Sequence, residues 1–335
     1  MKAVVLVGGE GTRLRPFTEV VPKPLIPFMN RPFLHQVLDH LAAHGVREAI
    51  LSSPYLEQVF RGFLESRKGD PAVTWITESQ PLGTSGAVVG ALEHLEDAFF
   101  VLNGDILTDL DLSALIDFHR RSEALGTIAL TRVADARPFG LVETDSNGRV
   151  LAFKEKPVEP MPGTVNAGTY VLEPRALANV SQGVMVSIER ETFPSLIAGG
   201  ERLFAFVSED YWRDLGTPEA YLQAHFDALA GKIGGGYSQP LVGEGCRIDA
   251  GAAVGPMVVL GDRAAVGPAA RVERSVLHER ASVGEGAAVE GSVLGFDSEV
   301  GAGAVVRDCL LAPGAKVGPG KEVHGARIRP GELVS

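Results

Sequence analysis

A glycine-rich segment and two cations near the N-terminus are the strongest chemical signal in this sequence. Residues 8–16 read GGEGTRLRP and follow the short apolar run of residues 2–7. A glycine loop that leaves a buried strand lets backbone N–H groups approach an anion without a Cβ in the way. Arg13 offers a planar fork of donors, and Lys23, between two prolines, offers a point charge. These features predict a site for a chain of phosphates, in a spacing that matches neither Gly-x-Gly-x-x-Gly nor the Walker loop.

Two aspartates have the setting of ligands to a divalent cation. Asp105 follows the apolar run of residues 98–102, and Asp214 precedes a helix start at Thr217. Taken singly, Asp105 is equally well explained by an Asx-turn, and the alternative role of Asp214 is a local cap. As a pair they predict a Mg²⁺ site, because Mg²⁺ takes one or two carboxylates together with phosphate oxygens and water.

The order of the motifs resembles the sugar-phosphate nucleotidyltransferase family, in which Gly-x-Gly-Thr-Arg leads on to Pro-Lys-Pro. Further family-like segments follow in order: PLGTSGA at 81–87, NGD at 103–105, FG at 139–140, KEKP at 154–157, NAG at 166–168 and WRDLGTP at 212–218. The resemblance covers essentially the whole chain. The sequences of these motifs most resemble those of mannose-1-phosphate guanylyltransferases, many of which carry a C-terminal β-helix.

The resemblance implies a reaction in which a sugar 1-phosphate attacks the α-phosphorus of a nucleoside triphosphate and pyrophosphate leaves. It implies catalytic roles for Arg13, Lys23, Asp105, Lys156 and Asp214, with Mg²⁺ held by Asp105 and Asp214. The implied nucleotide-binding positions are Leu6, Gly8, Gly9, Gly11, Thr12, Arg13, Gln80, Leu82, Gly83, Thr84, Ser85, Gly86 and Asp105. The implied sugar-phosphate contacts are Gly140, Glu155, Lys156 and Asn166. From the residues alone, Glu155 and Lys156 are equally a solvated charge pair, and Gln80 an exposed loop residue.

Several alternatives stay open from the sequence. GTP with mannose 1-phosphate is the favoured substrate pair, but thymidylyl or uridylyl transfer to glucose 1-phosphate fits too, as does guanylyl transfer to a heptose or cyclitol phosphate. A two-headed enzyme, like N-acetylglucosamine-1-phosphate uridylyltransferases, would use the C-terminal repeats for acyl transfer with His278 or His324. A non-catalytic paralogue, like the nucleotidyltransferase-like subunits of translation initiation factor 2B, is disfavoured because all four of Arg13, Lys23, Asp105 and Asp214 are present.

The first 231 residues alternate between apolar β-rich runs and helical patterns. Strands are predicted at 2–7, 48–52, 73–77 and 98–102, helices at 32–44, 56–65 and 84–95, a hairpin at 141–154, and a final helix from Thr217 to Gly231. Such alternation predicts a Rossmann-like, mostly parallel sheet in an α/β domain. Ligands bind at the carboxyl ends of parallel strands, so the loops after Val7 and Leu102 are expected to face the same site.

Beyond residue 241 an aliphatic residue recurs every six positions, and later in a 5-6-6 spacing that sums to 17. Residues 272–288, 289–305 and 306–322 align with one another. The period predicts a triangular solenoid that resembles the left-handed parallel β-helix of hexapeptide repeats. A disordered Gly/Ala-rich tail would have no reason to keep this register. We therefore predict a catalytic domain at 1–231, a linker at 232–240 and a β-helix at 241–335.

Composition narrows the partners. The net charge of −11 disfavours a nucleic-acid partner, which normally needs a basic face. Two cysteines and the lack of a signal-peptide or membrane-length apolar run favour a cytoplasmic protein with no membrane partner. No histidine has a metal-ligand setting, and no serine lies in a nucleophile elbow. The open edges of a β-helix need covering, which favours a homo-oligomer.

Overall fold

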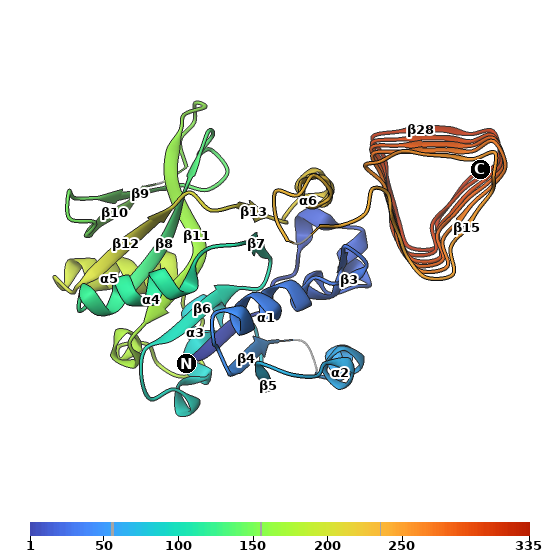
Figure 1. Ribbon diagram of the computed structural model, residues 1–335. Coiled ribbons are helices and arrows are strands. Elements are labelled where there is room, and N and C mark those ends of the chain that lie inside the picture. The colour runs from blue at the N-terminus through green and yellow to red at the C-terminus, as the bar shows by residue number, and fades with distance from the viewer. Residues whose placement is uncertain (55–56, 155, 235) are drawn as a thin grey trace. The chain divides into compact units, whose positions relative to one another are not determined.

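Packing divides the chain into two units whose boundaries do not follow the order of the sequence. The computed structural model (Figure 1) describes residues 1–335 except 55–56, 155 and 235. The first unit comprises Met1–Gly9 and Leu34–Trp212, and the second comprises Glu10–Phe33 and Arg213–Ser335. Packing therefore groups the segment of residues 10–33 and the last helix with the C-terminal repeats, whereas the sequence predicts them as part of residues 1–231.

The first unit is built on a seven-stranded sheet in the order β12-β8-β11-β6-β1-β4-β5. The strands are β1 (Lys2–Leu6), β4 (Glu48–Ser53), β5 (Ala72–Thr77), β6 (Phe99–Asn103), β8 (Gly126–Val133), β11 (Gly163–Leu172) and β12 (Leu203–Ser208). β1 pairs in parallel with β4 and β6, β4 with β5, and β8 with β12. β11 runs antiparallel to both β6 and β8. The mostly parallel Rossmann-like sheet is thus confirmed.

Helices pack on this sheet through apolar faces that the sequence spaces at three and four residues. They are α1 (Leu34–Ala43), α2 (Glu57–Ser66), α3 (Gly83–Gly90), α4 (Leu112–Arg121) and α5 (Phe193–Ala198). α1 buries Leu34, Val37, Leu38 and Leu41. The hairpin of β9 (Leu141–Thr144) and β10 (Val150–Lys154) is antiparallel as predicted, and β7 (Ile106–Thr108) follows β6 directly. Within the described part of the chain, no helix has the length and apolar character needed to cross a membrane.

The second unit contains the predicted β-helix, which Figure 1 shows along its axis as a triangular stack of coils. One side is β14 (Leu241–Val242), β17 (Val259–Leu260), β20 (Val276–Leu277), β23 (Val293–Leu294), β26 (Leu310–Leu311) and β29 (Arg327–Ile328). The next is β15 (Arg247–Ile248), β18 (Ala265–Val266), β21 (Ser282–Val283), β24 (Glu299–Val300), β27 (Lys316–Val317) and β30 (Leu333–Val334). The third is β16 (Ala253–Val254), β19 (Arg271–Glu273), β22 (Ala288–Glu290), β25 (Val305–Arg307) and β28 (Glu322–His324).

The repeat of 17 residues becomes the register between coils. Val272 pairs with Val289, Val289 with Val306, and Val306 with Val323, each in parallel. The inward aliphatic residues of successive coils therefore stack on one another and form the core of the prism. This confirms the left-handed parallel β-helix predicted from the spacing.

The second unit also contains the segment of residues 10–33 and a helix, α6 (Pro218–Leu229). This segment forms three 3-10 turns, Thr12–Leu14, Phe17–Glu19 and Lys23–Leu25, and a short pair of strands, β2 (Pro27–Phe28) and β3 (Arg31–Pro32). α6 begins as predicted, with Thr217 Oγ1 accepting a hydrogen bond from Ala220 N at 3.2 Å. β13 (Trp212–Asp214) leads into it. An apolar cluster joins the segment and α6 to the β-helix, and comprises Leu14, Phe17, Ile26, Tyr221, Val293 and Leu310.

Candidate active site

The loops after β1 and β6 lie at the same edge of the sheet, as the parallel pairing requires. Leu6 pairs with Asn103, and Gly104 N donates a hydrogen bond to Leu6 O at 2.9 Å. A Cβ on Gly104 would lie 2.8 Å from that same oxygen, so only glycine allows this approach. Asp105 follows immediately and is half-buried. Gly8 packs against Pro54, whereas the position of a Cβ on Gly9 is open space.

The predicted sugar-contacting turn, residues 166–168, packs directly on the turn that carries Asp105. Gly168 has a φ of +72°, and a Cβ there would lie 2.7 Å from Asn103 Nδ2. The Asn166 side chain closes the turn by accepting a hydrogen bond from Gly168 N at 2.9 Å. The structure thus brings Asn166 and the Asp105 turn together, although 60 residues separate them in the chain.

Asn166 belongs to a hydrogen-bonded triangle with Tyr170 and Glu189. Its Nδ2 donates to Glu189 Oε1 at 2.7 Å and to the Tyr170 hydroxyl at 2.7 Å, and that hydroxyl donates to Glu189 Oε1 at 3.2 Å. Burial, the charge of Glu189 and, more weakly, the charge of Asp105 raise the pKa of Tyr170 well above its usual value. Both protons of the Asn166 amide are therefore used within the fold, and the exposed carboxylate of Glu189 is the charged group beside it.

The predicted base-pocket segment is held from both sides. On one side, the buried carboxylate of Glu78 accepts hydrogen bonds from Leu82 N at 3.0 Å and from Ser52 Oγ at 2.9 Å. On the other side, the backbone of residues 184–186 lies so close that a Cβ on Gly83 would be 2.7 Å from Val186 O, and one on Gly86 would overlap Val184 O. Glycine is required at both positions for this packing. Gln80 is exposed at the start of the segment.

Two hydroxyls of this segment serve the fold. Thr84 Oγ1 accepts a hydrogen bond from Ile188 N at 2.6 Å, and the buried Ser85 Oγ lies 2.6 Å from Thr192 Oγ1. These contacts fasten residues 186–192, which carry Glu189, to the base-pocket segment. Both hydroxyls are therefore engaged in contacts within the fold.

Gly140 and Lys156 lie together at the end of the hairpin. Gly140 has a φ of +75°, and a Cβ there would lie 3.0 Å from Lys154 O and 3.9 Å from Lys156 N. Lys156 is exposed just beyond β10, while Lys154 forms an ion pair with Glu143 across the hairpin. Glu155, the other predicted sugar-phosphate contact, lies outside the described residues.

In the second unit, Asp214 lies between Arg13 and Lys23. Arg13 Nη2 donates a hydrogen bond to Asp214 Oδ2 at 3.0 Å, and Lys23 Nζ lies 3.6 Å from Oδ1. Lys23 is only 8% exposed, whereas the Arg13 side chain is more than half exposed. Gly11 starts the turn that presents Thr12 and Arg13 with a φ of 59°, and its carbonyl accepts from Thr18 Oγ1 at 2.8 Å. Three predicted catalytic residues thus meet in one cluster.

The same carboxylate offers an oxygen of the type that binds divalent cations. Asp214 Oδ1 is buried and has no hydrogen-bond partner, a costly state for a carboxylate oxygen. Oxygen ligands from one or two carboxylates are what Mg²⁺ uses beside phosphate groups. The metal-binding roles of Asp214 and Asp105 stay predictions, whereas the local-cap alternative for Asp214 is removed because Thr217 caps α6.

His278 is a packing residue. It is buried between Phe17, Tyr221 and Phe296, with its Nε2 3.3 Å from the Tyr221 hydroxyl. Burial and the neighbouring His225 lower the pKa of His278 to about 3. An acyl-transfer base must reach its substrate, so this position no longer supports the two-headed alternative.

Two residues of these clusters were missed in the sequence. Glu189 lies in a segment without a clear period, where a carboxylate is normally solvated. Only the polar character of Glu78, at the end of an apolar strand next to the base-pocket segment, offered a signal.

Comparison with known proteins agrees with the motifs and the fold. Residues 2–231 match the nucleotidyl transferase family, and residues 237–335 match the GMPPB C-terminal domain. The chain belongs to the nucleotidyl transferase family. It is a sugar-1-phosphate nucleotidyltransferase, as predicted, and enzymes of this family generally use a divalent metal ion.

Two curated relatives of this nucleotidyl transferase each match 82% of the chain. It is 40% identical over 287 residues to mannose-1-phosphate guanylyltransferase of Mycobacterium tuberculosis, covering 82% of this chain and 79% of that protein. It is 36% identical over 291 residues to mannose-1-phosphate guanylyltransferase 1 of Arabidopsis thaliana, covering 82% and 80%. Among solved structures, HddC from Yersinia pseudotuberculosis matches with a TM-score of 0.60 and 29% identity, over 67% of this chain and 97% of HddC. HddC is also known in complex with GMP-PN.

Proposed function

We propose that this enzyme transfers a guanylyl group from GTP to mannose 1-phosphate and makes GDP-mannose and pyrophosphate. The observation that carries the proposal is the cluster of Arg13, Lys23 and Asp214, in which two cations lie beside one carboxylate whose Oδ1 accepts no hydrogen bond. The guanylyltransferase names of the relatives and the GMP-PN complex of HddC support guanosine as the nucleoside.

In the proposed reaction, a phosphate oxygen of mannose 1-phosphate forms a bond to the α-phosphorus of GTP. The bond between that phosphorus and the β-phosphate bridging oxygen breaks, and pyrophosphate leaves with the electron pair. The attacking phosphate is already anionic, so the residues need to position and neutralise rather than to remove a proton. Backbone N–H groups of residues 8–12 and the guanidinium of Arg13 hold the triphosphate, and Arg13 offsets the charge that moves onto pyrophosphate.

Lys23 and the two aspartates act on the reacting phosphates. Lys23 is nearly buried, so its charge is poorly screened by water and attracts phosphate strongly. Asp105 and Asp214 are proposed to hold Mg²⁺, which when bound supplies positive charge to the oxygens of the α-phosphate. The buried Oδ1 of Asp214 is the atom best prepared for this role.

The sugar phosphate and the base are proposed to bind on the first unit. Lys156 and the backbone of Gly140 take the phosphate of the sugar, and Glu155, Asn166 and Glu189 take its hydroxyls. We assign the accepting role to Glu189, because the Asn166 carbonyl oxygen already accepts a hydrogen bond from Gly168 N. Gln80 and residues 82–86 frame the base beside Leu6.

A substrate matrix tests the proposal. GTP, dTTP, UTP, ATP and CTP are each offered with mannose 1-phosphate, glucose 1-phosphate, and a heptose and a cyclitol phosphate, and pyrophosphate release is measured with Mg²⁺ present. We expect the highest kcat/KM for GTP with mannose 1-phosphate. A clear preference for dTTP or UTP with glucose 1-phosphate, or for GTP with another sugar phosphate, would replace this substrate pair, and no release from any pair would contradict the activity.

We further propose that the enzyme acts in the cytoplasm as a homo-oligomer, with a catalytic domain at 1–231, a linker at 232–240 and a β-helix at 241–335. The nucleotide substrates and the two free cysteines support the compartment. Self-association is supported by the first β-helix coil, whose inward residues Val242 and Ile248 are 43% and 40% exposed. Light scattering during size-exclusion chromatography measures the oligomeric state, and a monomer at micromolar concentration would contradict it.

A further inference from the structure

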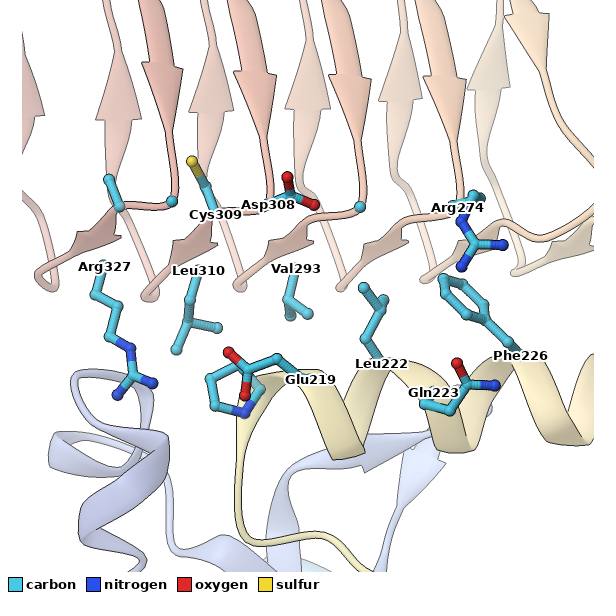
Figure 2. Close-up of a pocket in the computed structure, with 14 residues that line it drawn as sticks. Glu219, Leu222, Gln223, Phe226, Arg274, Val293, Asp308, Cys309, Leu310 and Arg327 are labelled. Carbon is cyan, nitrogen blue, oxygen red and sulfur yellow. The ribbon is translucent and has the colours of Figure 1, made fainter. Parts of the chain in front are cut away.

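A groove of about 270 Å³ runs between α6 and the β-helix within the second unit. Figure 2 shows Leu222, Gln223 and Phe226 of α6 on one wall and the coils of the β-helix on the other, with Arg327 at one end. The Arg327 side chain extends out of its coil beside the start of α6. The guanidinium is therefore carried beyond the β-helix itself.

The guanidinium of Arg327 binds the backbone of the phosphate loop, here defined as residues 8–15. Its Nη1 donates to Arg13 O at 2.9 Å and to Arg15 O at 3.3 Å. These carbonyls lie at the carboxyl end of the 3-10 turn Thr12–Leu14, where carbonyl groups have no donor within the turn. A cation at that end satisfies them with charge-assisted hydrogen bonds. One side chain thus fixes the carbonyls on both sides of Leu14.

Leu14 itself is held by two other coils on the same side of the β-helix. Its side chain is 3% exposed and packs with Phe17 against Val293 and Leu310 of the β-helix. Adjacent side chains of the turn point in different directions, so burying Leu14 leaves Arg13 directed to Asp214. The β-helix therefore fixes both the backbone at Arg13 and the side chain of Leu14, the residue next to it.

We propose that Arg327 is a positioning residue for nucleotidyl transfer, which sets the direction of the Arg13 guanidinium through the backbone of the phosphate loop. The inference rests on the proposed function, since Arg13 is taken to neutralise charge on the leaving pyrophosphate. It gives the β-helix a part in the reaction, although Arg327 touches no substrate. The apolar contact of Leu14 attaches the phosphate loop to the β-helix. The hydrogen bonds of Arg327 to the carbonyls of Arg13 and Arg15 then fix the orientation of the backbone there.

The experiment compares Arg327→Ala and Arg327→Lys with Arg329→Ala in the full chain. Arg329 is exposed two residues further along the same coil, so its removal changes the charge of the coil equally. For Arg327→Ala we expect kcat to fall about tenfold, the scale of one charge-assisted hydrogen bond. We expect the KM for pyrophosphate in the reverse reaction to rise by a similar factor and the KM for mannose 1-phosphate to stay unchanged. Arg327→Lys keeps a donor and recovers part of the loss, and Arg329→Ala matches the wild type.

Two readouts separate positioning from a merely structural role. A structural role would lower the active fraction and leave the KM for pyrophosphate unchanged, which would overturn the proposal. In a double-mutant cycle, Arg327→Ala should add little to the loss already caused by Arg13→Ala, and full additivity would overturn it too.

Hydrogen exchange of the phosphate loop does not depend on catalysis. We expect the amides of residues 11–15 to exchange faster in Arg327→Ala than in the wild type or in Arg329→Ala, and equal exchange would overturn the proposal. An inactive wild type would refute the proposed function, whereas an active wild type matched by Arg327→Ala in kcat and in both KM values would refute only the role of Arg327.

Discussion

Asp214 accepts a hydrogen bond from Arg13 at 3.0 Å through Oδ2, while its Oδ1 is buried without a hydrogen-bond donor. The two residues are 201 positions apart, so the fold rather than the local sequence joins them. One oxygen of the carboxylate orients a guanidinium, and the other faces the Lys23 ammonium at 3.6 Å without accepting a hydrogen bond. The oxygen that accepts no hydrogen bond is the one that we propose as a ligand to the metal ion.

Replacing Asp214 with Asn removes the negative charge of the side chain and keeps its size. The amide oxygen of Asp214→Asn still accepts from Arg13, but the negative charge is lost. We expect kcat to fall by about 10²–10³, with the thermal midpoint nearly unchanged. Pyrophosphate release should also need far more Mg²⁺ to reach half its maximum. Asp117→Asn, on the exposed side of α4, should match the wild type, and an unchanged Mg²⁺ dependence in Asp214→Asn would remove Asp214 from the metal-binding pair.

Gly216→Ala tests the Arg13–Asp214 pair by steric displacement. A Cβ on Gly216 would overlap Arg13 Nη2 and lie 2.9 Å from Asp214 Oδ1. The obstacle is mainly the end of a flexible side chain, so the protein should fold while the guanidinium moves. We expect kcat to fall about 10²-fold, the cost of a displacement of about 1 Å at a reacting centre. Gly62→Ala in α2, where a Cβ meets open space, is the control and should keep full activity. Full activity in Gly216→Ala as well would mean that this orientation of Arg13 is not the productive one.

Much of this architecture can be predicted from local sequence patterns. The alternation of strands and helices, the hairpin, the Thr217 cap and the 17-residue register all follow from periodicity within short windows. The direction of β11 does not follow from periodicity. A buried apolar strand has the same pattern whichever way it runs, so the antiparallel pairing of β11 with β6 and β8 had no signal in its residues.

The candidate site was predictable by residue type but not by contact. Glycines and charges at unusual spacings marked Arg13, Lys23 and Asp214, whereas their meeting depends on packing over two hundred residues. The use of the Thr84 and Ser85 hydroxyls within the fold depends in the same way on residues 186–192. Glu189 and Arg327 had no signal, because an exposed charge in a loop or coil is normally solvated.

Glu189→Gln tests the assignment of the sugar hydroxyls. The amide keeps the size of the side chain and an oxygen for Asn166, but it is a weaker acceptor for a hydroxyl group. We expect the KM for mannose 1-phosphate to rise about tenfold and the KM for GTP to stay unchanged. Glu201→Gln, an exposed position at the start of the segment before β12, serves as the control. Equal KM values in Glu189→Gln and the wild type would return the hydroxyl contacts to Asn166.

The buried histidines predict that acid weakens the second unit. Burial lowers the pKa of His225 to about 4, and burial with the charge of His225 lowers that of His278 to about 3. Both imidazoles are neutral in the folded protein. In the unfolded chain each binds a proton below the ordinary histidine pKa of about 6.5. The two histidines therefore contribute their full share to the free energy of unfolding above pH 6.5. This free energy falls as the pH drops, by about 2 kcal/mol for each imidazole at pH 5.

The acid sensitivity is measured as the thermal midpoint at pH 7.5 and pH 5. His278→Gln keeps a polar group for the Tyr221 hydroxyl but cannot titrate, so its midpoint should fall less between these pH values than that of the wild type. The difference should be on the order of 5 °C. An equal fall in both proteins would show that His278 is not protonated on unfolding in this range.

The most direct test is pyrophosphate release from GTP and mannose 1-phosphate by the wild type and by Arg13→Ala under identical Mg²⁺ and pH. We expect robust turnover by the wild type and a kcat lower by about 10²–10³ in the variant, with both proteins unfolding at the same temperature. Turnover by Arg13→Ala near that of the wild type would contradict the central role of the cluster formed by Arg13, Lys23 and Asp214.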